Sequence, residues 1–162
     1  MTERSPVSAL ATALKRLNDA DVALACVVTR RTVTSATKRR PITADHYFRL
    51  CAFAGVDPVS GWDIAPRAPG PFDQGLFSLG VALRRMLNGH SLRQAGKAMG
   101  ISYASVERIE DHKAVSIETT LAACKYVGVH PFGYCHGTFD VSRGTGGVIA
   151  PQEGARPDVR AA

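Results

Sequence analysis

The sequence lacks the hydrophobic segments that carry a protein into or through a membrane. None of its apolar runs approaches the roughly 18–20 residues that a membrane-spanning helix needs. The first ten residues, MTERSPVSAL, have charges at positions 3 and 4 and then polar residues at short spacing. A signal peptide has a charged segment followed by an apolar one, which is a different layout. We therefore expect a cytoplasmic protein with no membrane partner.

Cysteine is scarce, and its spacing is not typical of metal binding. The four cysteines are Cys26, Cys51, Cys124 and Cys135. They lack the close spacing of a zinc knuckle, and two of them are flanked by apolar residues, so buried reduced thiols are the favoured interpretation. A cluster of Cys135 with His130 and His136 would offer too few ligands at useful spacing. We expect no metal site.

The chain also lacks motifs for catalysis and for binding phosphate-bearing cofactors. No Ser/His/Asp or Cys/His arrangement has motif support, and there is no Gly-rich phosphate loop. The five histidines are scattered along the sequence. We therefore expect no enzymatic activity, no cofactor and no small-molecule ligand.

Positive charge and apolar content are what the composition does supply. Hydrophobic residues make up 45% of the 162 positions, which is ample for a core, and the formal net charge is +6. A net positive charge of this size favours a polyanionic partner.

One segment of the chain occurs twice. Residues 51–58 read CAFAGVDP, and residues 124–131 read CKYVGVHP. At this offset of 73 positions, residues 19–58 align with residues 92–131 without a gap, and the identities fall at apolar, capping and turn positions. Self-similarity at a fixed offset is the mark of a duplicated structural unit. The sequence therefore predicts two copies of one fold.

The second copy has the clearer helical pattern. We expect helices over 77–89, 92–100, 103–111 and 117–127, with Ser91, Ser102 and Ser116 as N-caps of the last three. Gly100 and Gly128 are expected to end their helices in the left-handed conformation. Leu79, Leu83, Met86 and Leu87 recur at helical spacing, and this stripe is expected to lie in the core.

The first copy is expected to form helices over 8–18, 20–27, 30–39 and 44–54, with caps at Asn18, Thr29 and Thr43. The fold class is thus all-α, with two tandem units of four to five helices. We place a first domain at 6–59, a Pro- and Gly-containing linker at 60–74, a second domain at 75–136 and an irregular, disordered tail at 137–162.

The second copy resembles the phage repressor (XRE, Cro/CI-like) family of helix-turn-helix proteins. The segments SLRQAGKAMGISYASVERIE and SIETTLAACKYVGV carry the resemblance, through Ser91, the Ala95-Gly96 pair, the MGIS turn and the Val106, Ile109 positions. The first copy matches more weakly. The resemblance implies lambda-repressor-like units whose third helix enters the major groove of DNA.

The resemblance also implies which residues would touch DNA. The base-facing candidates are Arg30, Arg31, Thr32 and Ser35 in the first copy, and Tyr103, Ala104, Ser105 and Arg108 in the second. The phosphate-facing candidates are Lys38, Arg39, Arg40, Ser91, Arg93, Lys97 and Lys113. Leu92 departs from the family pattern, because a phosphate-contacting Gln often stands there, and Asp19 and Asp21 would repel a phosphate.

The two copies differ in charge around the expected recognition helix. Residues 29–40 hold five basic and no acidic side chains, whereas residues 102–113 have a net charge of −1. We therefore expect the first copy to supply more of the electrostatic affinity for DNA.

Together these features predict a sequence-specific regulator of transcription that binds double-stranded DNA. The resemblance implies that it acts as a repressor. Because the two recognition helices differ, we expect them to read unlike half-sites. A protein-interaction module, such as an antitoxin or an antagonist of another regulator, is the alternative. In that case one or both copies would make no contact with DNA. Further homodimerisation through an exposed apolar patch is left open.

Overall fold

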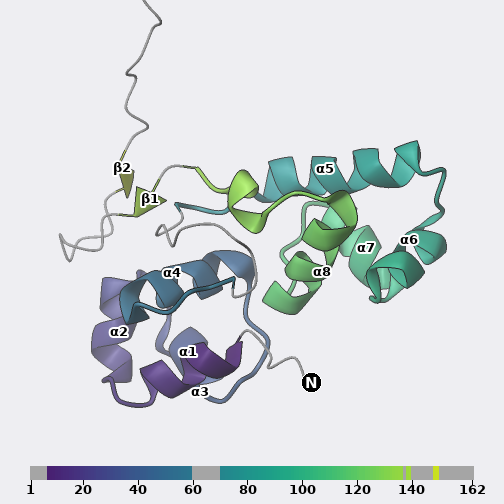
Figure 1. Ribbon diagram of the computed structural model, residues 1–162. Helices are drawn as coiled ribbons and strands as arrows, with labels where there is room; N and C mark the ends of the chain where they lie inside the picture. Colours follow the sequence, from purple (N-terminus) through teal and green to yellow (C-terminus); the bar gives the residue numbers. More distant parts are fainter. Residues whose placement is uncertain (1–6, 60–69, 137, 140–147, 150–162) are drawn as a thin grey trace, which may run out of the picture.

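The computed structural model describes residues 7–59, 70–136, 138–139 and 148–149. Within residues 7–59 lie four α-helices: α1 (Val7–Leu14), α2 (Asp19–Ala25), α3 (Arg30–Thr37) and α4 (Ala44–Ala54). Residues 70–136 hold four more: α5 (Gln74–Leu87), α6 (Leu92–Met99), α7 (Tyr103–Glu110) and α8 (Ile117–Val127). The expected all-α class is confirmed. We call the two helix sets unit 1 and unit 2 (Figure 1).

Two short elements follow α8. A 3-10 helix, η1, spans Pro131–Tyr134, and the strands β1 (Thr138–Phe139) and β2 (Val148–Ile149) pair antiparallel in the segment expected to be irregular. The other positions of that segment lie outside the described residues, as do residues 60–69, which include most of the expected linker and its Trp62.

The helix starts follow the expected capping residues. Asn18, Thr29, Ser91, Ser102 and Ser116 each accept a hydrogen bond from a backbone N–H in the first turn of their helix. Such a bond satisfies one of the donors that a helix start leaves without a partner. These five caps are confirmed. Thr43 is also an N-cap, but its side chain makes no capping bond.

Positive backbone φ angles recur at the offset of the repeat. Gly55 and Gly128 end α4 and α8 in the left-handed region, as expected. Arg39 (φ 55°) and His112 (φ 57°) occupy equivalent places after α3 and α7, and Val27 (φ 53°) is the counterpart of Gly100 (φ 71°). The three pairs show that the two units share their backbone turns as well as their helices.

Val27 is strained, because a β-branched residue is disfavoured at positive φ. Replacing it with glycine, the residue that unit 2 has at this turn, is expected to raise the free energy of unfolding by about 1 kcal/mol. The side chain of Val27 is 65% exposed, so the substitution removes little packing. Urea denaturation measures the change, and Gly100→Val should shift stability in the opposite direction. A Val27→Gly protein less stable than the wild type would contradict the strain.

Each unit has its own hydrophobic core. That of unit 1 is built around Leu10, Leu14, Val33, Tyr47, Phe48 and Leu50, and that of unit 2 around Phe77, Val81, Met99, Val106, Ile109 and Tyr134. The Tyr47 hydroxyl donates to the carbonyl of Pro58 at 3.0 Å, which ties the end of unit 1 to its core. These apolar faces account for the helical periodicity of the sequence.

The two units are in direct contact through the segments that precede α4 and α8. Thr43 and Ser116, which occupy the same position in the two copies, form an isolated antiparallel bridge. The Ile117 N–H donates to the Ile42 carbonyl at 2.8 Å, and the fully buried Ile117 side chain belongs to the core of unit 1. The first of these contacts joins equivalent positions of the repeat, whereas the second does not, and Ala44, the counterpart of Ile117, also belongs to the core of unit 1. We call Ile42, Thr43, Ser116 and Ile117 the joint.

Aromatic rings extend the contact between the units. The ring of Phe48 in α4 lies 6.1 Å from that of Phe72 and 5.6 Å from that of Phe132, centroid to centroid. Phe72 in turn lies 5.3 Å from Phe77 of the second core. The two cores are therefore linked by a chain of packed rings in addition to the joint.

The expectation for the leucine stripe of the helix after the linker is wrong. The buried side of α5 is made by Phe77, Ser78 and Val81. The expected core residues are instead exposed: Leu79 by 52%, Leu83 by 46%, Met86 by 58% and Leu87 by 80%. Helical spacing fixes which residues share a face but not which face turns inward, and here α5 lies at the edge of the molecule (Figure 1).

Candidate nucleic-acid interface

The first turns of α3 and α7 have the same polar structure. Thr29 Oγ1 accepts from the Thr32 N–H at 3.2 Å and lies 3.0 Å from Thr32 Oγ1. At the equivalent place, Ser102 Oγ accepts from the Ser105 N–H at 3.1 Å and lies 2.8 Å from Ser105 Oγ. Helix N-termini of this kind favour negatively charged groups because backbone N–H groups and the helix dipole point toward them.

The preceding helices hold α3 and α7 in place by close packing. In unit 2, a Cβ on Gly96 would lie 2.9 Å from the Ile101 carbonyl oxygen, so α6 and the turn after it approach too closely for a side chain. Ala23 is the counterpart in unit 1, where the Thr34 hydroxyl also donates to Asp19 Oδ2 at 3.1 Å. Val33 and Val106 turn inward from α3 and α7, which leaves the opposite side of each helix outward.

An open concavity of about 460 Å³ lies between the units. Its walls combine both copies: Thr29, Arg31, Thr32 and Ser35 of unit 1 face Ser105 and Arg108 of unit 2, and residues 41–43 and 114–116 line its floor beside the joint. Most of these residues come in pairs related by the offset of 73. We call this concavity the cleft. It brings together five of the eight expected base-facing residues: Arg31, Thr32, Ser35, Ser105 and Arg108.

The cationic candidates of unit 1 are all accessible. Arg30, Arg31, Lys38, Arg39 and Arg40 are exposed, and none of them forms an ion pair within the described part of the chain. Arg30 begins α3 but does not line the cleft, whereas Arg31 does. Thr32 and Ser35 are half-buried in the cleft wall. This side of the molecule therefore presents concentrated, uncompensated positive charge.

Several candidate side chains of unit 2 already make contacts within the protein. Tyr103 is 53% exposed, and the guanidinium of Arg93 lies 5.7 Å from the centre of its ring, at cation–π distance. Lys113 Nζ pairs with Asp111 at 2.9 Å, and an Arg108 guanidinium N–H donates to the Ala114 carbonyl at 3.3 Å. Both basic groups near the end of α7 are thus already in contact with protein.

The remaining candidates of unit 2 lie on the surface. Ala104 and Lys97 are exposed. Ser91 is exposed too, but its hydroxyl already accepts from the Gln94 N–H, while Gln94 Oε1 accepts from the Ser91 N–H at 2.8 Å. This reciprocal capping box fixes the start of α6.

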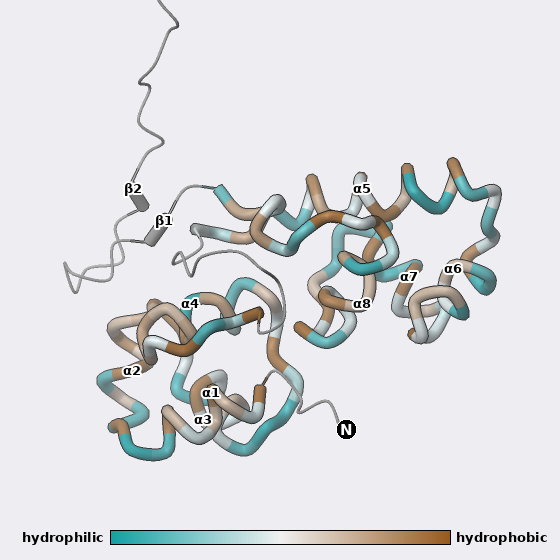
Figure 2. The backbone as a smooth tube through the Cα atoms, in the orientation of Figure 1, coloured by the Kyte–Doolittle hydropathy of each residue, from teal (hydrophilic) through white to brown (hydrophobic). Residues whose placement is uncertain are grey.

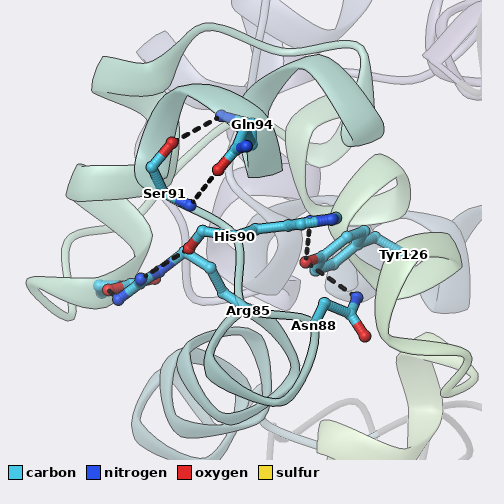
Figure 3. A network of polar contacts seen from close by, with 7 residues as sticks. Arg85, Asn88, His90, Ser91, Gln94 and Tyr126 are labelled. Carbon is cyan, nitrogen blue, oxygen red and sulfur yellow. Dashed lines mark hydrogen bonds and ion pairs between the residues drawn. The ribbon is translucent and has the colours of Figure 1, made fainter.

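A polar network that the sequence pattern did not predict connects α5 and the turn after it to the end of α7 and to α8 (Figure 3). Arg85 of α5 forms a bidentate pair with Glu110, with Nε–Oε1 2.6 Å and Nη2–Oε2 2.9 Å, and Glu110 raises the pKa of Arg85. Arg85 also donates to the His90 carbonyl at 3.1 Å. The Tyr126 hydroxyl lies 3.0 Å from His90 Nδ1 and accepts from Asn88 at 3.2 Å.

This network changes the charge balance of unit 2. The count over residues 102–113 treats Glu110 as unpaired, but in the structure Arg85 compensates it, and the local net charge becomes zero instead of −1. The partners lie 25 positions apart and follow no local motif, so only the capping box of Ser91 and Gln94 could have been found from spacing. The contrast with unit 1 therefore persists but is smaller.

His46 is a further cleft residue that the sequence did not single out. It projects from α4 of unit 1 into the lining, and its counterpart in unit 2, Thr119, lines the cleft as well. The cleft thus combines two guanidinium groups, one imidazole and several hydroxyls. Such a set of donors suits the oxygen atoms of phosphates and sugars.

The thiols take no part in this surface. Cys26, Cys51 and Cys124 are buried and Cys135 is half-buried, and all four are free. Burial raises the pKa to about 11 for Cys26 and to about 12 for the other three, which keeps the thiols protonated at neutral pH. The described residues contain no group of three or more side chains arranged to hold a metal ion, and no helix among them is long and apolar enough to cross a membrane.

Comparison of the chain with protein-family models, with curated proteins and with solved structures finds no match.

Proposed function

We propose that the protein is a sequence-specific regulator of transcription that binds double-stranded DNA, and that it acts as a repressor. In this proposal each unit is a lambda-repressor-like helix-turn-helix of the XRE (Cro/CI-like) kind, with α2–α3 and α6–α7 as the two motifs. The observation that carries the proposal is the cleft, whose two walls are formed by α3 and α7 at equivalent positions of the repeat.

Charge supports a polyanionic partner for this surface. Five cations without an ion pair among the described residues lie on or just after α3. Of the three acids on or just after α7, Glu110 pairs with Arg85 and Asp111 with Lys113, which leaves Glu107. A DNA duplex presents phosphates on both sides of each groove, so a surface with donors on two walls can hold two phosphate ridges. The unlike residues of the two helices would then read unlike half-sites.

Titration of random-sequence duplex at several salt concentrations tests the proposal. The logarithm of the binding constant should fall steeply with the logarithm of salt concentration. Lys38→Gln with Arg40→Gln should make this slope shallower by about 2, because each neutralised phosphate contributes about 0.9. Arg84→Gln with Lys125→Gln is the matched control, since it removes two charges from α5 and α8, away from the basic residues that follow α3.

A protein-interaction module is the second candidate, and the engaged side chains on and just after α7, those of Arg108 and Lys113, favour it for unit 2. Absence of duplex binding at ~50 mM salt would contradict the DNA proposal and favour this alternative. Equal slope changes in the two double variants would show attraction by net charge alone, without specific phosphate contacts by Lys38 and Arg40, and would also contradict the DNA proposal.

A further inference from the structure

Helix α5 is apolar on two opposite sides. Phe77 and Val81 face the core of unit 2, while Leu76, Leu79, Leu83, Met86 and Leu87 are between 44% and 80% exposed. At about 100° per residue these five positions centre opposite to the buried side. Hydrophobic positions accordingly recur along α5 at the edge of the molecule (Figure 2). A helix that is apolar all round is ordinarily buried all round.

The spacing of the exposed face is that of a helix-pairing seam. Leu76, Leu79, Leu83 and Met86 are separated by three, four and three positions, which is the a/d repeat of a coiled coil over nearly two heptads. A face made only to cover unit 2 would have no need of this second repeat. We call these four residues and Leu87 the α5 seam.

We propose that the α5 seam packs against the same seam of a second copy of the chain, with the two helices antiparallel. In an antiparallel pair centred on Val81, Leu79 lies opposite Leu83 and Leu76 opposite Met86. The large, exposed Leu87 then faces Gly75, which has no side chain. Large residues therefore meet large ones in the middle, and a small residue receives the largest protrusion at each end, as interdigitated packing requires.

Charge favours the same arrangement. The described helix α5 has no acidic residue, and its two arginines lie off the seam, with Arg85 already paired to Glu110. An antiparallel pair places Arg84 of one copy opposite position 78 of the other, so like charges do not meet. An antiparallel pair also places the partly positive N-terminus of each helix beside the partly negative C-terminus of the other, which is favourable, whereas a parallel pair would place like ends together.

The exposed area is sufficient for a moderate dimer. The five side chains expose on the order of 500 Å² of apolar surface, within the range of the largest patches on monomers, which are often functional. Two copies would bury about 1,000 Å², the lower bound of specific interfaces. This self-association does not rest on the proposed function, because neither α3 nor α7 contributes to the seam.

Sedimentation equilibrium of the full chain between about 1 µM and 1 mM tests the inference. The average mass should rise from the 17.3 kDa of one chain toward twice that value. Leu79→Gln with Leu83→Gln should weaken the association by about 30-fold or more. Leu17→Gln with Leu24→Gln removes two exposed leucines of unit 1 and should leave the association unchanged.

Circular dichroism at low concentration shows whether each variant is folded. We expect both variants to fold, because the substituted side chains are exposed. A folded wild-type protein that stays at 17.3 kDa up to about 1 mM would overturn the proposal, as would a seam variant that associates as strongly as the wild type. Association abolished equally by the control variant would place the contact elsewhere and would also overturn it.

Discussion

Replacing Arg30 and Arg31 together with alanine is expected to weaken binding to the preferred duplex by about 30-fold to 10⁴-fold. The two side chains are exposed at the first turn of α3 and make no ion pair within the described residues. In the proposed complex each substitution removes one contact with a base, and each lost contact costs about 1–3 kcal/mol of binding free energy.

Selection of bound duplexes from a random pool measures the effect on specificity. The double variant should lose preference at a few adjacent base pairs, while Tyr103→Ala with Ser105→Ala should alter a different set. An unchanged selected sequence for the Arg30/Arg31 variant, with only a shallower salt dependence, would mean that these residues hold phosphates and that unit 1 does not read bases.

Replacing Ile117 with alanine is expected to lower the free energy of unfolding by about 2–5 kcal/mol and to loosen the joint. The side chain is fully buried, and although it begins α8 of unit 2, it fills the core of unit 1. The substitution therefore leaves a cavity between the units. In the proposed DNA complex α3 and α7 would lose their fixed spacing, and the affinity should fall toward that of one unit.

Ile109→Ala is the matched control, because Ile109 is equally buried but lies in the core of unit 2 alone. Chemical denaturation gives the stability of both variants, and titration of duplexes with altered half-site spacing gives the coupling. Only the Ile117 variant should tolerate altered spacing. If both variants retain the wild-type spacing preference, the joint does not set the geometry of binding.

The sequence was sufficient for features governed by neighbouring residues. Helix ends at Ser91, Ser102 and Gly128 follow from capping chemistry and from the left-handed turn, both of which act within a few positions. The repeat itself also followed, since apolar and turn residues recur at one offset. These predictions needed no knowledge of how distant segments pack.

What could not be predicted depends on tertiary placement. The leucines of α5 have the periodicity of a core face, yet Phe77 and Val81 take that role because the ring of Phe77 packs against Phe72 and Tyr134. The pairing of Arg85 with Glu110 joins helices 25 positions apart, and Ile117 crosses into the other unit. The hydrophobic periodicity of a helix does not determine which other segment its apolar side packs against.

The position of Ile117 has a consequence for the order of events during synthesis. Residues 7–59 leave the ribosome well before residue 117, so the first half of the protein emerges with a gap in its interior that a later segment must fill. Its early form should be looser and more prone to stick to other nascent chains. An amino-terminal fragment ending near residue 59 would keep that vacancy for its whole lifetime.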